Sequence, residues 1–220
     1  MRKQRPRGAV TREAVVNAAL TLVDKRGMAR LTVRALARVV EAPPMSLYTH
    51  FSNKEELLDL MYEEISRRIY EDEHNATWQA ELLALSKRIH RVLGEHSRWI
   101  DLMGRSTAPT PAATRERVLQ LMIEDGLTAD VAFHGLSAVI LGSIGLVLAN
   151  LTISGNKGKT SLASRFARMR SAVDTAALDG AITRLAVSKV ERFDFERQLE
   201  FTMQTVIAGL ESKRGLSGSH

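Results

Sequence analysis

The sequence predicts an all-α protein with a small N-terminal helical unit followed by a larger helical region. Apolar residues recur at helical spacing in each long segment, and we find no convincing strand alternation and no internal repeat. With 220 residues, of which 45% are hydrophobic, the chain is long enough to bury a sizeable core. These observations favour a fold built from helix-on-helix packing.

The first predicted helix covers residues 11–26. Thr11 is suited to cap its start, and Gly27 to end it. Its apolar face consists of Ala14, Val15, Ala18, Ala19, Leu22 and Val23. We expect this helix to support the motif that follows.

Residues 31–57 have the pattern of a helix-turn-helix with a capped helix behind it. The apolar stripe of the first helix consists of Leu31, Val33, Leu36, Ala37 and Val40. Pro43 and Pro44 end that helix, because proline lacks a backbone N–H and restricts the residue before it, while Pro44 or Met45 is a good first residue for the next helix. Two short helices joined by such a turn are typical of proteins that place a recognition helix in the DNA major groove.

Four further helices are predicted. Residues 52–55 form a capping box, in which the Ser52 side chain accepts the amide of Glu55 and the Glu55 carboxylate accepts the amide of Ser52; that helix runs to about residue 71. The others cover residues 78–95, 111–125 and 130–153.

Residues 131–153 contain only His134 as an ionisable group, so their length and polarity also suit a membrane span. Small residues such as Gly135 and Gly142 favour a closely packed helix of a soluble protein, and we interpret the segment in that way. Near the C-terminus, a helix with a single apolar stripe is predicted from Phe195, Leu199, Thr202, Met203, Val206 and Leu210.

The first quarter of the chain resembles the tetracycline-repressor (TetR) family of one-component bacterial regulators. The matching residues are Thr32, Leu36-Ala37, Ser46-Leu47-Tyr48, His50-Phe51 and Lys54-Glu55-Glu56-Leu57-Leu58. Glu41 departs from the pattern where the family commonly has a turn glycine, and Pro43 where it commonly has a capping serine. The resemblance implies a homodimeric transcriptional regulator, usually a repressor, that binds a palindromic operator in double-stranded DNA and responds to a small-molecule effector.

The resemblance also implies which residues meet DNA. Those near the bases are Arg34, Pro44, Met45, Ser46 and Tyr48, and those near the phosphates are Thr32, Tyr48, Thr49, His50 and Lys54. Of the base-proximal residues, only arginine can form a bidentate pair with a guanine edge. The charge distribution supports DNA binding by the first part of the chain. Of the formal charge of +6, all lies in residues 1–56, which hold 11 Lys/Arg against 5 Asp/Glu, whereas residues 57–220 hold 20 of each.

Four parts of the chain are expected: a flexible basic arm (1–10), a DNA-binding domain (11–57), a regulatory ligand-binding and dimerisation domain (58–212) and a tail (213–220). A mostly apolar effector pocket is expected from His96, Trp99, Met103, Leu119, Met122, His134 and Leu141, although each is individually typical of plain core. A dimer interface is expected from Gly142, Leu199, Met203, Val206 and Leu210, although a core within one chain would give the same stripe.

Other chemistry finds no support in the sequence. Without cysteine there is no thiol nucleophile and no cysteine-based zinc site, and the histidines form no metal motif, so we expect no cofactor, no metal and no catalysis. The basic N-terminus is not followed by an apolar signal core, which favours a cytoplasmic protein without a membrane partner. The alternatives to a ligand-responsive repressor are a DNA-binding regulator without small-molecule input and an unrecognised helical enzyme.

Overall fold

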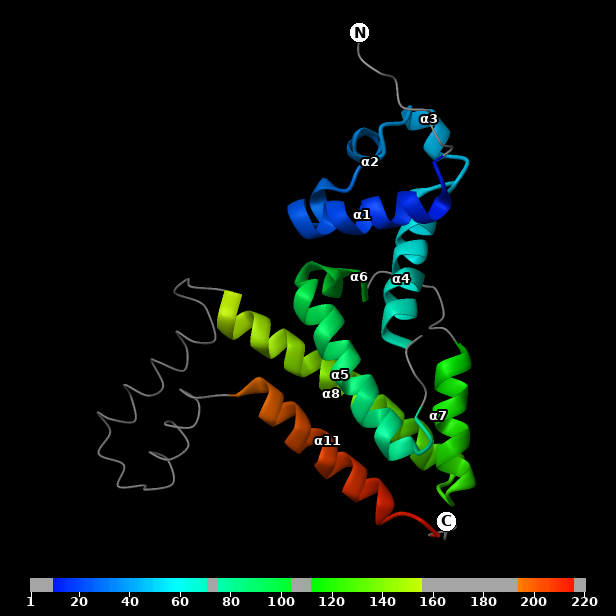
Figure 1. The fold of residues 1–220 in the computed structure, drawn as a ribbon, viewed down its shortest axis with the longest axis vertical. Coiled ribbons are helices and arrows are strands. Elements are labelled where there is room, and N and C mark those ends of the chain that lie inside the picture. Colours follow the sequence, from blue (N-terminus) through cyan, green and yellow to red (C-terminus); the bar gives the residue numbers. More distant parts are fainter. Residues whose placement is uncertain (1–9, 71–74, 104–111, 156–193, 216–220) are drawn as a thin grey trace, which may run out of the picture. The chain divides into compact units, whose positions relative to one another are not determined.

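The computed structural model describes residues 10–70, 75–103, 112–155 and 194–215, and across these ranges the predicted all-α fold is confirmed (Figure 1). The described helices form two compact units. The first unit contains α1 to α4 together with a short segment after residue 94, and the second contains α5, α7, α8 and α11. Most of the predicted basic arm and of the tail lies outside the described residues.

Helix α1 (Arg12–Arg26) begins and ends as its sequence predicts. The Thr11 hydroxyl accepts a hydrogen bond from the amide of Ala14 at 3.1 Å, and Gly27 ends the helix with a φ of 76°. The buried face is rotated slightly from the predicted one, because Ala14 is exposed whereas Val16 and Leu20 are buried. A 3-10 turn, η1 (Met28–Arg30), follows.

The helix-turn-helix consists of α2 (Val33–Val39) and α3 (Pro44–Leu47). The Thr32 side chain caps α2 by accepting the amide of Ala35 at 3.2 Å. Leu36 of α2 and Leu47 of α3 are both fully buried, so the two helices are fixed against the core of the first unit. Their outer faces are thereby left for other contacts.

Glu41, in the turn between α2 and α3, has a φ of 53°. This left-handed conformation explains why the family pattern favours glycine there, since a side chain costs about 1–2 kcal/mol in that region. We expect Glu41→Gly to raise the free energy of unfolding by about 0.5–1 kcal/mol, after the extra entropy of glycine in the unfolded chain is subtracted. Urea unfolding checks this, with Ala42→Gly as the control that gains nothing; a lower midpoint for Glu41→Gly would contradict it.

Helix α4 (Lys54–Tyr70) is capped one residue later than predicted, at Asn53 and not at Ser52. Asn53, not Ser52, accepts the amide of Glu56 at 2.8 Å, and the Glu56 carboxylate, not that of Glu55, accepts the amide of Ser52 at 2.6 Å. The hydrogen bonds from Ser52 and the nearby Arg12 guanidinium lower the pKa of Glu56. Because Arg12 lies on α1, Glu56 also connects the starts of α1 and α4.

The second unit consists of α5 (Trp78–Glu95), α7 (Ala112–Glu124), α8 (Ala129–Gly155) and α11 (Phe195–Glu211), close to the predicted bounds. Helices α8 and α11 pack along each other (Figure 1). Gly135 permits their close approach, since a Cβ there would lie 2.6 Å from Cδ2 of Leu210. Their contact is therefore an internal part of the chain.

Within α8, Ala129–Leu151 is long and apolar enough to cross a membrane by length and composition, with a mean hydropathy of 2.1. This is weak evidence for a span, because a packed helix of a soluble protein passes the same test. The buried side chains on α8, among them Leu136 and Val139, face its packing within the second unit. Other apolar side chains of α8, among them Leu141 and Leu148, are exposed.

Candidate DNA-binding surface and effector cavity

The nine predicted DNA contacts gather on the outer surface of α2, α3 and the start of α4. All are exposed except His50, which is half-buried, and Met45 has 76% of its surface exposed. The structure thus leaves eight of these residues exposed, outside the core of the first unit, and their contact with DNA stays a prediction.

A shallow hollow on this surface lies between α2 and the turn. Arg34 and Arg38 line it together with Glu41 and Pro44. Arg38 is not among the predicted contacts, although its spacing of four residues from Arg34 places both on one face of α2. Two exposed guanidinium groups side by side suit an anionic partner.

The hydroxyl groups of the recognition helix are held by their own backbone. The Ser46 hydroxyl donates to the carbonyl of Pro43 at 2.7 Å, and the Thr49 hydroxyl donates to the carbonyl of Ser46 at 2.7 Å. A phosphate oxygen only accepts hydrogen bonds, so these two side chains would have to release their present partners to bind one. Lys54, exposed at the positive N-terminal end of α4, is the better placed phosphate ligand.

Tyr48 is oriented by packing on its own motif. Its ring lies 5.9 Å from the ring of Phe51, which is buried, and the two planes are tilted by 50°. Tyr48 itself is exposed, and its packing on Phe51 restricts the orientation of its ring. An amphipathic side chain held in this way can meet either a phosphate or a base edge.

The predicted effector residues do not come together in one cavity among the described residues. His96 and Trp99 lie in the first unit, in and beside the 3-10 turn η2 (Ser97–Trp99), which is followed by α6 (Ile100–Met103). The side chain of Met103 lies outside the described set. In the second unit Met122 is buried and Leu119 half-buried, while His134 and Leu141 are exposed on α8. The sequence-based pocket is therefore not supported at His134 and Leu141, because both side chains stand at the surface.

His96 and Trp99 instead tie the segment after α5 to α1 and α4. Nδ1 of His96 lies 2.7 Å from a carboxylate oxygen of Asp24 on α1, and the His96 ring stacks on Trp99 at 3.8 Å. The guanidinium of Arg68 on α4 lies 5.2 Å from the centre of the Trp99 ring and also donates to Asn17 at 2.6 Å. The packing thus does not follow the predicted boundary at residue 58, since α4 and this segment belong to the first unit.

The predicted dimer residues are mostly internal to the chain. Leu199, Met203 and Leu210 are buried, and two of them meet α8: a Cβ at Gly142 would lie 3.8 Å from Cε of Met203, and one at Gly135 would lie 2.6 Å from Cδ2 of Leu210. Side chains already covered by their own chain leave no surface for a second copy. For these three leucine and methionine side chains the assignment as interface contacts is therefore not supported, whereas Gly142 and Val206 are half-buried and their assignment stays a prediction.

The same two helices also carry exposed apolar side chains. Leu141 on α8 has 69% of its surface exposed and Phe201 on α11 has 64%, and Phe133 and Leu148 of α8 are exposed beside them in sequence register. A Cβ at Gly145, which lies between Leu141 and Leu148, would meet nothing within 4 Å in the described parts of the chain. Several large exposed apolar side chains on one helix pair are candidates for an interaction site.

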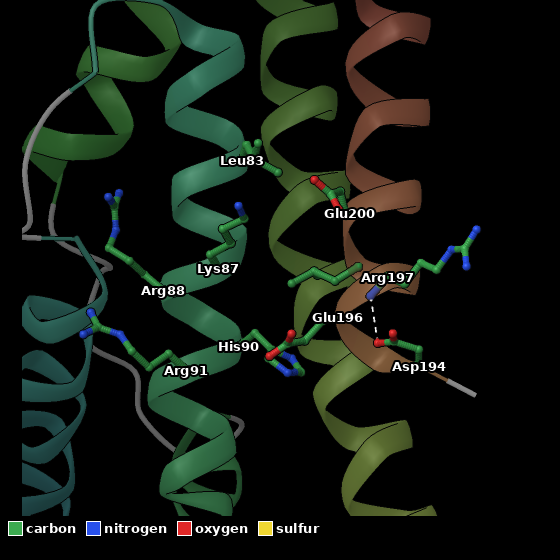
Figure 2. A pocket seen from close by; sticks show the side chains of 10 residues that line it. Leu83, Lys87, Arg88, His90, Arg91, Asp194, Glu196, Arg197 and Glu200 are labelled. Atoms are coloured by element: carbon green, nitrogen blue, oxygen red, sulfur yellow. Dashed lines mark hydrogen bonds between the residues drawn. The ribbon is translucent and has the colours of Figure 1, made fainter. Parts of the chain in front are cut away.

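A cavity of about 760 Å³ lies between α5 and the first turns of α11 (Figure 2). Its α5 wall includes Leu83, Lys87 and His90, and its α11 wall includes Glu196 and Glu200. Its size suits a drug-sized organic molecule, and none of these residues was expected from the sequence. The spacing of 83, 87 and 90 on one helix face was the only signal that could have indicated them.

One charged residue beside this cavity, Arg88, forms an ion pair inside the second unit. Arg88 forms a buried ion pair with Glu81 at 2.7 Å, and Glu81 also accepts the amide and the side-chain nitrogen of Asn75. Burial opposes the ionisation of Glu81, but these hydrogen bonds and the Arg88 charge outweigh it and lower its pKa. This pair fixes the start of α5 and leaves the remaining charged groups to define the cavity.

Comparison with known proteins finds two family models along the chain. Residues 15–61 match the model described as bacterial regulatory proteins of the tetR family, and residues 71–214 match the tetracyclin repressor-like C-terminal domain. Together they cover both structural units.

Individual relatives agree with the family models. The chain is 28% identical over 150 residues to an HTH-type transcriptional regulator from Saccharopolyspora erythraea, covering 65% of this chain and 63% of that protein. It is 30% identical over 143 residues to the tetracycline repressor protein class D from Escherichia coli, covering 63% of this chain and 66% of that protein. The chain thus spans just under two thirds of the length of these curated relatives.

Among solved structures, the fold is similar to that of ActR from Streptomyces coelicolor in complex with actinorhodin. The TM-score is 0.73 at 20% identity, over 96% of this chain and 99% of that one. At this identity the likeness establishes the fold alone.

Proposed function

This chain belongs to the tetracycline-repressor family of bacterial transcriptional regulators, and we propose that it is a homodimeric repressor that leaves a palindromic operator when a small molecule binds its second unit. The observation that carries the proposal is the set of exposed side chains on α2, α3 and the start of α4. The names of the relatives as transcriptional regulators and repressors support it.

The direct test selects DNA from a random pool with the purified protein. We expect an enriched palindrome with half-sites about one helical turn apart, bound with an affinity that falls steeply with salt. Adding a compound library should then release the selected DNA in some wells. A protein that enriched no sequence would contradict the proposal.

Arg34 is proposed to read a guanine edge from α2. Removing its guanidinium with Arg34→Ala should cost about 1–3 kcal/mol on the selected palindrome and much less on random DNA, because a bidentate base contact exists only on the true site. Fluorescence anisotropy on both DNAs measures the difference. Equal losses on the two DNAs would show that Arg34 touches only phosphate.

Lys54→Ala is the matched comparison for Arg34→Ala. A phosphate contact should weaken both DNAs alike and reduce the slope of log K against log salt by roughly one unit. A loss confined to the palindrome for Arg34→Ala, together with an equal loss on both DNAs for Lys54→Ala, would assign base reading to α2 and phosphate anchoring to the start of α4.

Dimerisation is proposed through a face that includes the exposed apolar side chains Phe133, Leu141 and Leu148 of α8 and Phe201 of α11. A short recognition helix alone buries too little surface for tight specific binding, whereas two copies about a two-fold axis can occupy successive major grooves. A second copy is the occupant that would cover this face and double the number of reading helices.

Coupling between effector and DNA is proposed to pass along α5. At the end of this helix the chain enters the segment whose His96 and Trp99 side chains hold α1 and α4. An effector that shifts α5 would move these contacts and tilt the helix that begins at Lys54. It must bind the DNA-incompetent state more tightly, because equal affinity for both states shifts nothing.

A further inference from the structure

The short helix α3 carries the most exposed methionine among the described side chains. Met45 has 76% of its surface exposed, so its thioether is open to solvent. Met61, Met122 and Met203 are each 0% exposed, and Met28 is half-buried. An oxidant in solution therefore reaches the sulfur of Met45 more readily than that of the other four.

The composition of the chain makes methionine its only sulfur chemistry. The chain has eight methionines and no cysteine. Thiolates are the protein groups that peroxides attack most readily, and here no thiol competes with the thioethers for an oxidant. The product, methionine sulfoxide, is returned to methionine by dedicated reductases, so the change is reversible.

The position of Met45 separates its oxidation from the stability of the fold. Leu47, which is 0% exposed, anchors α3 in the core of the first unit, whereas Met45 stands outside that core. The first turn of α3 is held by its own contacts, since the Ser46 hydroxyl donates to the carbonyl of Pro43 at 2.7 Å. An added oxygen on Met45 thus changes the outer surface of α3 and leaves its packing intact.

We propose that Met45 is a reversible oxidation site and that its conversion to the sulfoxide weakens operator binding. The oxidant is a peroxide. One oxygen atom passes to the sulfur as the O–O bond breaks and the S–O bond forms, the sulfur is oxidised by two electrons, and hydrogen peroxide is reduced to water. This inference rests on the proposed function, which places Met45 on the DNA-binding surface.

The expected loss of affinity follows from the chemistry of the two surfaces. A sulfoxide oxygen accepts hydrogen bonds and donates none. Phosphate oxygens only accept as well, and acceptors outnumber donors on the base edges of the major groove. An oxygen that loses its water in such an interface without gaining a donor should cost about tenfold in affinity.

Peroxide treatment of the full-length protein tests the site. Graded hydrogen peroxide is added, peptide mass spectrometry measures the sulfoxide at each methionine, and anisotropy measures affinity for the selected palindrome. Met45 should be oxidised before Met28 and the three buried methionines, and affinity should fall about tenfold in step with it. Methionine sulfoxide reductase should restore binding, and operator DNA present during treatment should protect Met45.

Two leucine variants assign the loss to one sulfur. Met45→Leu has no sulfur at this site, so peroxide should cause no further loss from whatever operator affinity the untreated variant has. Met28→Leu is the matched control, because it removes a half-buried methionine outside α3 and should lose affinity on oxidation as the parent does. Circular dichroism should show the same helix content before and after treatment.

The inference is overturned if Met45 is oxidised no faster than the buried methionines, or if complete oxidation of Met45 leaves operator affinity unaltered. A Met45→Leu protein that loses affinity in peroxide like the parent also overturns it. Because the parent's loss and its recovery with the reductase stand alone, a Met45→Leu protein without operator affinity leaves the test decisive. Intact operator binding before treatment beside a failed peroxide test rejects only the oxidation site, whereas an untreated parent that binds no operator rejects the proposed function.

Discussion

Leu141→Asp is expected to abolish specific operator binding while leaving each chain folded. Leu141 is exposed on α8, so an aspartate there is solvated in the monomer, but it would bury an unpaired charge if a second copy covers this face. The monomer keeps one reading head, and its affinity for the palindrome should fall about 10³-fold or more toward non-specific binding.

Sedimentation velocity and anisotropy measure the two effects. The variant should sediment as a monomer with the helix content of the parent, and its residual DNA binding should remain sensitive to salt. Ile123→Asp is the matched control, because Ile123 is also exposed and apolar but lies on α7, which supplies no residue to the proposed interface. A dimeric Leu141→Asp protein with full operator affinity would refute the α8 interface.

Met203→Asp is expected to destabilise the second unit, and not to act as a clean dimer-breaking change. Met203 is 0% exposed and packs against α8 at Gly142, so its aspartate would be buried within the chain whether or not a dimer forms. The lost apolar contact and the buried charge should together lower the free energy of unfolding by about 4 kcal/mol or more.

Urea unfolding in the Leu141→Asp background isolates this effect from dimerisation. Met203→Leu conserves volume and should cost less than about 1.5 kcal/mol. Phe201→Asp places the same charge two residues away on the exposed side of α11 and should leave the monomer midpoint nearly unchanged. A Met203→Asp monomer as stable as its background would show that the α8 and α11 contact is not a core.

Local signals explain why much of the first unit was predictable. Several signals act within a few residues of the chain, namely the Thr11 cap, the Gly27 stop and the proline pair of the turn. They can therefore be recognised without knowledge of the tertiary fold. Glu41 is the clearest instance. The family pattern favours glycine at this position, and the residue there has a positive φ. The capping box of α4 was misplaced by one residue because Ser52 and Asn53 are both good caps and Glu55 and Glu56 are both able to reach back.

The amphipathic stripes were harder to interpret. A stripe such as Leu199 with Met203 shows that one face of a helix is buried, but not whether its own chain or a second copy buries it. His134 and Leu141 show the converse, because a helix that is apolar nearly all round gives no sign of which side stands in solvent.

The all-α class, the approximate helix bounds, the helix-turn-helix and the family could all be predicted from the amino-acid sequence, because helix periodicity, caps and turns are properties of neighbouring residues. Which contacts are internal was settled by the packing of the folded chain. That packing placed His96 and Trp99 beside α1 and α4, turned Met203 inward and Leu141 outward, and formed a cavity from α5 and α11. These arrangements join residues far apart in the sequence, and no local pattern specifies how such faces meet.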